Sequence, residues 1–599
     1  MTAPLLSNRD LRFLLYEFLD TGMLLERPRY ADYSREIFDT TLETARQIAE
    51  EVFAPHNAKG DANEPQFEGG RVQMIPEAKD AWDAFAKAGF LSAHWDAEEG
   101  GLQMPEVVLR AAMAWFQAAN AGSSAYSFLT IGAANLLRSF GSGALKARYL
   151  APMGNGRFAG TMALTEPGQG SALGDIRTTA EPMPDGTYRI FGQKMFISGG
   201  DQSLTENIVH MVLARLKGGP LGAKGISLFL VPKVLVNEDG SLGARNDVAL
   251  AGLLHKMGWR NTTSTVLSFG ENEGAVGYLL GEAGKGLAHM FQMMNEARIG
   301  IGLYAACIAS RGYQLALDYA RQRPQGRLPS NKDPLSPQVM LVEHADIRRM
   351  LLAQKAYSEG ALALGLYASS LFEDQHTHPE AQARHEAALL LDLLTPVVKS
   401  WPAKYGCAAN DLAIQILGGS GYIRGYLPEQ LYRDQRLNPI HEGAEGIHGL
   451  DLLGRKVSMQ SGAAYRLFRT KADATIAEAR NIERLAELAD GFSVPLSRLD
   501  NVTTQLTALL ATEPDRALAN ATVYLDVFGR IVAAWIWLRL ALAADAASES
   551  ACDAERAFYA GKLQAARYFI VWELPAAAPQ LDLLTAVDAI PMEMRDEWF

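Results

Sequence analysis

The stretch TYRIFGQKMFIS, residues 187–198, indicates the fold class of this chain. Its β-branched and aromatic residues, bounded by turn residues, predict a strand. Similar runs follow at IVHMVLARL (208–216), ISLFLVP (226–232) and TSTVLSFG (263–270). We therefore expect a β-domain over residues 160–282.

The sequence on both sides of this β-domain has the period of a helix. REIFDTTLETARQIAEEVFAP (35–55) carries apolar residues at helical spacing, and long helical patterns return from Gly286. This order is not a βαβ alternation, and no GxGxxG follows a first strand, so a Rossmann site is disfavoured. The domains we expect are an N-terminal extension at 1–34, a helical domain at 35–159, the β-domain at 160–282, a helical bundle at 283–459 and a further helical domain at 460–599.

Composition limits the functions that this chain can have. At 599 residues it exceeds the size that one hydrophobic core usually serves. A net charge of -12 argues against a nucleic-acid or anionic-membrane binder. The chain has three cysteines, Cys307, Cys407 and Cys552, without CxxC spacing, which predicts neither disulfides nor a metal site and favours a reducing compartment.

No targeting segment is visible at the N-terminus, which lacks a basic region followed by an apolar one. The apolar run IVAAWIWL (531–538) is too short to span a bilayer core of about 30 Å, so we expect a buried helix there. These features predict a cytoplasmic protein that binds neither membrane nor nucleic acid.

Two segments of the β-domain carry residues suited to a planar or anionic ligand. In MALTEPGQGS (162–171), glycines permit close approach of backbone to a ligand, and Thr165 and Ser171 supply hydroxyls. In FGQKMFISGG (191–200), Phe196 and Ser198 fall on one face of a strand, because strand side chains alternate. Taken separately, the first segment also fits a surface turn, and the second a core phenylalanine.

A third segment, NPIHEG (438–443), places Glu442 in a loop before a helix. A carboxylate there can be an ordinary helix-start acid, favoured by the helix dipole. It can also be a general base, because burial in an apolar slot raises the basicity of a carboxylate. The local spacing does not distinguish these interpretations.

Several segments, in this order, resemble the acyl-CoA dehydrogenase family over residues 35–456: TEPGQGS, GQKMFISGG, HKMGWRNT, MMNEARIGIG, QILGGSGYI and YRDQRLNPIHEG. The resemblance implies a mainly α fold with an N-terminal helical domain, a β-barrel-like middle domain and a C-terminal four-helix bundle, with FAD between them. The leading segment and the extra C-terminal helical domain resemble the longer branch of the family, which includes 3-methylmercaptopropionyl-CoA dehydrogenase.

The resemblance also implies site residues. Thr165 and Ser198 are expected to hydrogen-bond the isoalloxazine, with Phe196 against the ring where many relatives have tryptophan. Arg323 and the QILGG backbone are expected to hold the ADP part of FAD, that of a neighbouring subunit. The full cofactor set is Met162, Leu164, Thr165, Gly170, Ser171, Phe196, Ser198, Arg323, Gln415, Gly418 and Gly419.

For the acyl-CoA, the resemblance implies binding by Ser171, Asn295, Arg298 and Gly443. Asn295 stands where relatives often have aspartate, and Ala444 where they commonly have threonine. Three simpler roles stay open at this point. Arg298 can pair with an acid, Gln415 can be a buried structural amide, and His441 can be a packing or solvent-facing residue.

The activity that the resemblance implies is α,β-dehydrogenation of an acyl-CoA thioester to the trans-2-enoyl-CoA. Glu442 is expected to remove the α-proton while the β-hydride goes to flavin N5. The position of the family's alternative base is Ala297 here, and Glu296, one residue away, faces elsewhere on the helix.

The expected substrate is 3-methylthiopropionyl-CoA or a short or medium fatty acyl-CoA, which places the protein in fatty acid metabolism. The expected electron acceptor is an electron-transfer flavoprotein, and the expected assembly a homodimer. The alternatives are an acyl-CoA oxidase using O₂ and a nucleic-acid-associated flavoprotein without turnover, the latter disfavoured by the acidic C-terminal region.

Overall fold

The computed structural model describes residues 3–331 and 333–599, apart from the side chain of Gln292. The chain forms two compact units. Unit 1 comprises residues 1–38, 105–114 and 298–599, and unit 2 comprises residues 39–104 and 115–297. Helices α2 (Arg35–Ile48), α5 (Glu106–Ala119) and α8 (Gly286–Gln322) run from one unit into the other.

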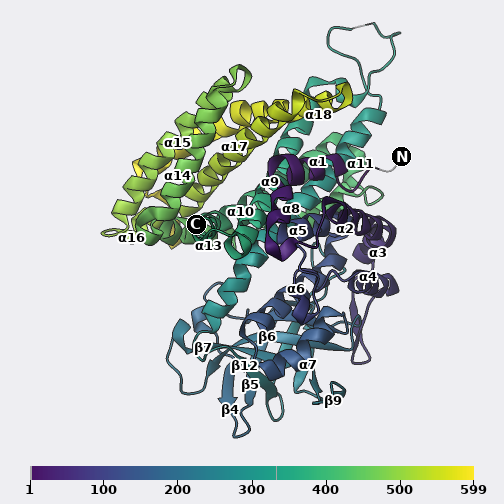
Figure 1. Ribbon diagram of the computed structural model, residues 1–599, viewed down its shortest axis with the longest axis vertical. Helices are drawn as coiled ribbons and strands as arrows, with labels where there is room; N and C mark the ends of the chain where they lie inside the picture. The colour runs from purple at the N-terminus through teal and green to yellow at the C-terminus, as the bar shows by residue number, and fades with distance from the viewer. Residues whose placement is uncertain (1–2, 332) are drawn as a thin grey trace. The chain divides into compact units, whose positions relative to one another are not determined.

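Unit 2 combines short helices with a β-domain (Figure 1). Its other helices are α3 (Asn57–Ala62), α4 (Pro76–Lys87), α6 (Ala121–Phe140) and α7 (Gly143–Gly154). A small hairpin of β1 (Gln66–Glu68) and β2 (Arg71–Gln73) lies within this helical region, where the sequence pattern predicts only helices. N-terminal caps start two of these helices, since Asn120 Oδ1 accepts from Ser123 N and Ser142 Oγ from Leu145 N.

The predicted strand TYRIFGQKMFIS is β5 (Tyr188–Ser198), and the other three predicted runs are also strands. The β-domain contains β3 (Phe158–Ala163), β4 (Thr179–Pro182), β5, β6 (Asn207–Leu216), β7 (Ile226–Pro232), β8 (Val234–Val236), β9 (Leu242–Arg245), β10 (Val248–Leu253), β11 (Ser264–Phe269) and β12 (Ala275–Leu280). The main sheet has the order β10-β11-β5-β12-β7-β6-β3, with β4 pairing both β5 and β6. The path β5-β12-β7-β6-β4 therefore returns to β5 as a closed ring, which is the expected barrel-like form.

Strand β6 is buried on both faces, because the ring has a core inside it and helices outside. Val209, Met211 and Leu213 pack in one cluster with residues of α6 and α7. Val212 and Ala214 pack in a second cluster with residues of β5, β7, β10 and β11. A strand covered on both faces has a nearly continuous apolar sequence, which explains the run IVHMVLARL.

Unit 1 is helical. Its core contains the second part of α8 together with α9 (Ala345–Thr377) and α10 (Ala381–Leu417), the two long antiparallel neighbours that contact each other most extensively. Short helices follow, namely α11 (Gly419–Tyr422), α12 (Pro428–Gln435) and α13 (Glu445–Asp451). Small residues permit close helix approach here, since a Cβ on Gly302 of α8 would lie 2.0 Å from the Val398 oxygen of α10.

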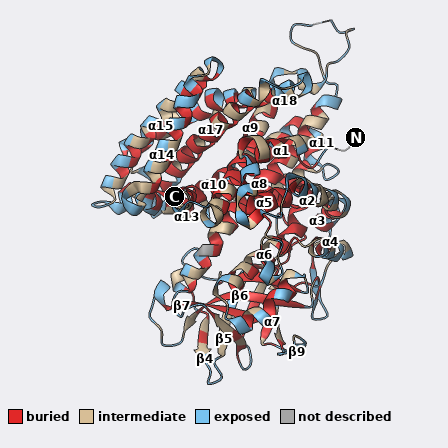
Figure 2. Cartoon of the chain, in the orientation of Figure 1, coloured by how far each residue is buried: buried red, intermediate tan, exposed pale blue. Residues whose placement is uncertain are grey.

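The C-terminal part of unit 1 begins at α14 (Met459–Arg480), whose residues 460–462 have left-handed backbone angles. The remaining helices are α15 (Glu483–Leu509), α16 (Pro514–Leu518), α17 (Ala521–Ser548), α18 (Asp553–Tyr568), α19 (Ala577–Ala586) and α20 (Ile590–Glu593). Figure 2 shows α17 mostly in the colour of buried residues, and residues 531–538 are all buried as expected. Among the described residues, α17 alone is long and apolar enough to cross a membrane, but 83% of its most apolar window is buried within the protein.

The N-terminal extension packs on α18 in the same unit. Helix α1 (Asn8–Phe13) brings Asp10 to the fully buried ammonium of Lys562, which also pairs with Glu359 of α9 at 2.8 Å. The ring of Phe13 meets that of Phe558 edge to face, with centroids 5.6 Å apart. Three segments far apart in the sequence are thus joined through one buried lysine.

Candidate active site

Glu442 lies in the loop between α12 and α13, and its backbone has a left-handed conformation. Its φ is +54° and that of Gly443 is +96°. A left-handed conformation is disfavoured for residues with a Cβ and persists only where the surroundings impose it. Such strain at a carboxylate favours a functional role over that of an ordinary helix-start acid.

The environment of Glu442 makes its carboxylate more basic than usual. Burial raises the pKa of Glu442, while the positive charges of Arg298 and Lys399 act in the opposite direction without cancelling the rise. A raised pKa suits proton abstraction, because such a carboxylate holds a captured proton more firmly than an exposed one.

Arg298, expected to bind CoA, is buried in α8 and pairs with Asp451 of α13. Its Nη1 lies 3.3 Å from Asp451 Oδ2, and Asp451 also binds Arg455 at 2.7 Å. Burial lowers the pKa of Arg298, although the charges of Asp451 and Glu442 raise it. The pairing with an acid is therefore present, and a contact of Arg298 with CoA stays a prediction.

Two histidines lie at the loop, and both are weak bases. Burial lowers the pKa of both His441 and His448 to about 3, so both rings are neutral. Nε2 of His448 lies 3.2 Å from the carbonyl oxygen of Glu442. Because a carbonyl oxygen only accepts hydrogen bonds, His448 carries its proton on Nε2 and donates it there.

Lys399 lies at the candidate site but was not predicted from the sequence. It is a fully buried lysine of α10 whose Nζ donates to the carbonyl oxygen of Gly443 at 2.5 Å. Burial lowers the pKa of Lys399 to about 8, although Glu442 and Glu445 raise it. The sequence contains a signal for it, namely a lysine inside the apolar run TPVVKSW. Lysine is rarely buried unless it is paired, so this position indicates a buried partner.

In unit 2, the loop that carries the predicted flavin-binding residues is anchored at its base. Nζ of Lys194 in β5 donates to the Leu164 oxygen at 2.9 Å and to Oε1 of Glu166 at 3.0 Å. Glu166 also accepts from the N–H groups of Arg177 and Thr178, at 2.6 and 2.9 Å. Burial lowers the pKa of Lys194 to about 8. Burial alone would raise the pKa of Glu166, but Lys194 and these donors lower it.

The anchored loop brings Thr165 next to the strand that carries Phe196. The Met195 N–H donates to the Thr165 oxygen at 2.9 Å. Phe196 is 63% exposed and has a φ of +60° at a bulge in the pairing of β5 with β11. Regular alternation is therefore interrupted at Phe196, yet Ile197 is buried and Ser198 is partly exposed, so Phe196 and Ser198 both face away from the core.

The remaining predicted residues lie in each unit as follows. Met162 is buried in β3, Leu164 is half-buried, and Gly170 and Ser171 are exposed on the loop. Asn295 is half-buried in α8, and its neighbour Glu296 accepts a hydrogen bond from Asn135 at 2.9 Å.

In unit 1, Arg323 is exposed just after α8, and Gln415, Gly418 and Gly419 are exposed where α10 ends. Because Gln415 is exposed, its interpretation as a buried structural amide is wrong.

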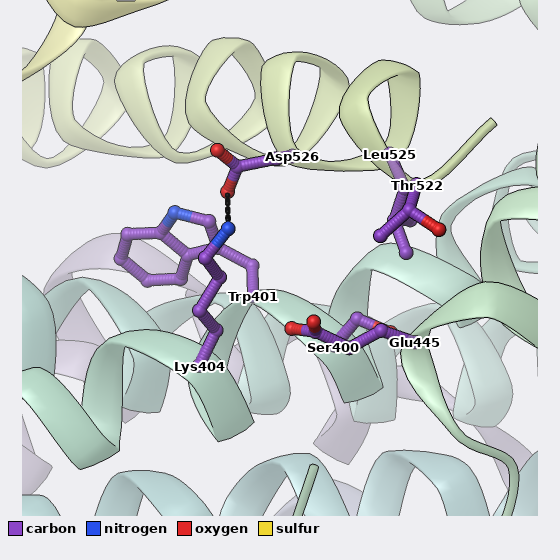
Figure 3. A pocket seen from close by; sticks show the side chains of 7 residues that line it. All are labelled: Ser400, Trp401, Lys404, Glu445, Thr522, Leu525 and Asp526. Atoms are coloured by element: carbon purple, nitrogen blue, oxygen red, sulfur yellow. Dashed lines mark ion pairs between the residues drawn. The ribbon is translucent and has the colours of Figure 1, made fainter. Parts of the chain in front are cut away.

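A small pocket adjoins α13 within unit 1 (Figure 3). It is lined by Ser400, Trp401, Lys404, Glu445, Thr522, Leu525 and Asp526. Lys404 reaches across from α10 to pair with Asp526 of α17 at 3.0 Å. Glu445 of α13 and Asp526 of α17 both line it, so α17 of the C-terminal domain borders the helix that follows Glu442.

The residues of unit 2 fit a bound flavin. An exposed aromatic ring, an adjacent hydroxyl at Thr165 and another at Ser198 lie beside an exposed glycine loop. A Cβ on Gly168 or Gly170 would meet no atom within 4 Å, so the space over this loop is open. These are the aromatic, donor and backbone groups that would hold FAD.

Comparison with known sequence families gives four successive matches. Residues 38–157, 161–271 and 284–457 match the families described as Acyl-CoA dehydrogenase, N-terminal, middle and C-terminal domain, respectively. Residues 468–595 match the family described as Acetyl-CoA dehydrogenase C-terminal like.

Several relatives match nearly the whole chain. The chain is 37% identical over 569 residues to 3-methylmercaptopropionyl-CoA dehydrogenase of Ruegeria pomeroyi, and the alignment covers 94% of each protein. It is 32% identical to the broad-specificity linear acyl-CoA dehydrogenase FadE5 of Mycobacterium tuberculosis, and that alignment covers 99% of each protein.

Solved structures share the fold. Caenorhabditis elegans ACDH-11 in complex with C11-CoA superposes with a TM-score of 0.75 at 20% identity, covering 99% of this chain and 97% of that one. An acyl-CoA dehydrogenase complexed with FAD from Bacillus anthracis gives a TM-score of 0.72 at 21% identity, covering 95% and 90%.

Proposed function

Because this chain belongs to the acyl-CoA dehydrogenase family, we propose that Glu442 is the base that removes the α-proton of an acyl-CoA thioester. The enzyme is an FAD-dependent oxidoreductase acting on a CH–CH group. The observation that carries the assignment of the base is the environment of Glu442. This carboxylate has a raised pKa and lies in a strained loop fixed at two successive carbonyl groups.

Two hydrogens leave the substrate, and the protein supplies an acceptor for one of them. FAD, when bound, supplies the acceptor for the β-hydride. Thr165 and Ser198 would donate to the ring system, and Phe196 would pack against it. Glu442 takes the α-proton, and its raised pKa favours the protonated carboxyl group that results.

Removal of the α-proton places negative charge on the thioester oxygen, which needs a hydrogen-bond donor. The backbone N–H of Glu442 makes no hydrogen bond with any residue that the structure describes. It is therefore available to the thioester oxygen. A donor held ready in this way stabilises the developing charge without reorganisation.

For the substrate, we propose a short linear acyl chain, either aliphatic or carrying a methylthio group. Two relatives named for such substrates support this choice, the 3-methylmercaptopropionyl-CoA dehydrogenase above and a butyryl-CoA dehydrogenase of Syntrophomonas wolfei that is 34% identical over 99% of this chain. A sulfur atom and a methylene differ little in an apolar pocket, where one methylene contributes about 1–3 kcal/mol.

We further propose an electron-transfer flavoprotein as acceptor, a homodimeric assembly and a cytoplasmic location. The resemblance to the longer branch of the family supports the first two. Cys307, Cys407 and Cys552 form no disulfide, which supports a reducing compartment.

Anaerobic titration of the FAD-loaded enzyme with a panel of acyl-CoA thioesters tests this function. Loss of flavin absorbance is expected with butyryl-CoA and 3-methylthiopropionyl-CoA, and weaker loss with branched or long chains. The same reaction in air, with an artificial acceptor present, should release little peroxide. Peroxide released at the rate of turnover would contradict the proposed acceptor.

A further inference from the structure

Lys399 is a buried charged residue to which the proposed reaction assigns no role. It lies in the middle of α10, between Val398 and Ser400, and is fully buried. A buried ammonium is costly unless it is paired, so its partners indicate what it does. Its hydrogen-bond partner is the carbonyl oxygen of Gly443, at 2.5 Å.

This bond is one of two that fix the backbone at the proposed base. The Glu442 oxygen accepts from His448 of α13, and the Gly443 oxygen accepts from Lys399 of α10. Two successive carbonyl groups are thus held by side chains from two different helices. Both residues have positive φ, and for Glu442, which has a Cβ, such a backbone persists only where the surrounding structure imposes it.

Lys399 also acts on Glu442 through its charge. The charged groups that act on Glu442 are Arg298 of α8 and Lys399 of α10, and both favour its ionised form. Lys399 in turn faces Arg298, Glu442 and Glu445 of α13. The two histidines at the loop are neutral, so they add no charge.

We propose that Lys399 is a positioning residue for the proposed base: it fixes the peptide that follows Glu442 and keeps a compensating positive charge beside the carboxylate. This inference rests on the proposed role of Glu442. It differs from a purely structural role, in which Lys399 would only tie α10 to the loop. A structural tie affects stability alone, whereas the proposed role also sets the pH at which Glu442 becomes active.

The test replaces Lys399 in two ways and uses a second buried lysine as control. Lys399→Met removes both the charge and the donor, and Lys399→Gln removes the charge but keeps an N–H donor. Lys456→Met is the matched control, since Lys456 is also buried with a pKa lowered to about 8, pairs with Asp392 and is not among the charges acting on Glu442.

Two measurements are made on each FAD-loaded variant. The first is the rate of anaerobic flavin reduction by butyryl-CoA between pH 5 and 9. The second is an infrared difference spectrum between each variant and the same variant that also carries Glu442→Gln. The carboxyl band in this difference follows the protonation of Glu442 without turnover.

Loss of the nearby cation should raise the pKa of Glu442 by about 1 unit in both Lys399 variants, because a positive charge favours the ionised carboxylate. The plateau rate should fall about 10-fold or more in Lys399→Met, and less in Lys399→Gln, which still holds the Gly443 carbonyl. Lys456→Met should leave the pKa of Glu442 unchanged.

An unchanged pKa of Glu442 in a folded, FAD-loaded Lys399 variant would overturn this inference. So would a shift of the same size in Lys456→Met. If Glu442→Gln alone reduced flavin at the wild-type rate, the proposed function of Glu442 would fail instead, so the two failures are distinguishable.

Discussion

The side chain of His448 holds the backbone of Glu442, six residues earlier in the chain, through a hydrogen bond from Nε2 to the Glu442 oxygen at 3.2 Å. The imidazole also lies against Gly443, where a Cβ would come within 2.7 Å of Nε2. The loop therefore depends on a glycine at 443 for two reasons, the close ring and a φ of +96°. The conformation of the proposed base and the packing of His448 are coupled at this residue.

Gly443→Ala should displace His448 and strain the loop. Because a residue with a Cβ in this conformation costs about 1–3 kcal/mol, the rate of flavin reduction should fall roughly 10- to 100-fold. Rapid-mixing absorbance measurements check this. Gly143→Ala is the control, because its Cβ would meet nothing within 4 Å. A Gly443→Ala enzyme with the wild-type rate would mean that the loop geometry is not needed.

Phe196→Ala should weaken retention of FAD without destabilising the protein. The ring is 63% exposed, so its removal leaves no cavity, but a stacking contact worth about 0.5–1.5 kcal/mol is lost. The dissociation constant for FAD, measured by fluorescence titration of the apoprotein, should rise by up to about 10-fold. Leu221→Ala, at a side chain that is 90% exposed in the same unit, should leave it unchanged. Equal FAD affinity in the two variants would refute the assignment of Phe196.

Gly449→Ala should disturb the packing of α13 on α17. A Cβ there would lie 2.7 Å from the backbone of Ala521, whereas one on Gly446 would come no closer than 3.9 Å to Thr522. We expect Gly449→Ala to lose about 1–3 kcal/mol of stability and Gly446→Ala to lose little. Thermal unfolding of both variants measures the difference. Equal melting temperatures would show that the C-terminal domain does not support the loop that carries the proposed base.

Lys562→Met should destabilise the junction of the N-terminal extension, α9 and α18. It leaves the buried carboxylates of Asp10 and Glu359 with Lys355 as the remaining cation, which pairs with Glu359 at 2.5 Å. Loss of one partner from a buried ion cluster costs about 3–5 kcal/mol. Chemical denaturation checks the loss. The exposed pair of Arg556 with Asp553 is the control, and Arg556→Ala should cost less than about 1 kcal/mol.

The sequence allowed local structure to be predicted where the pattern is strong. The runs that became β5, β6, β7 and β11 have strand composition, and the long helical period begins at Gly286, where α8 begins. The short hairpin at 66–73 escaped notice because three-residue strands carry too little pattern. The bulge at Phe196 also escaped, since pairing irregularities depend on the partner strand β11.

The site was predicted less completely, because its contacts are distant in the sequence. Glu442 was identified through its motif, but its backbone is held by Lys399, 43 positions away in α10 and bonded to the next residue. The pairing of Arg298 with Asp451 spans 153 positions. The docking of Asp10 on Lys562 spans 552 positions. Hydrophobic periodicity gives the elements but not which charged side chains meet after they pack.

The reductive half-reaction of Glu442→Gln tests the central claim most directly. The amide is close in size to the carboxylate but cannot accept the α-proton, so the loop and FAD binding should be retained. Wild-type and variant enzymes, loaded with equal FAD, are mixed anaerobically with butyryl-CoA, and the flavin absorbance is followed. The account predicts rapid bleaching of the wild type and a rate at least about 1,000-fold lower in Glu442→Gln, given the size of general-base contributions. Bleaching of Glu442→Gln at the wild-type rate would contradict it.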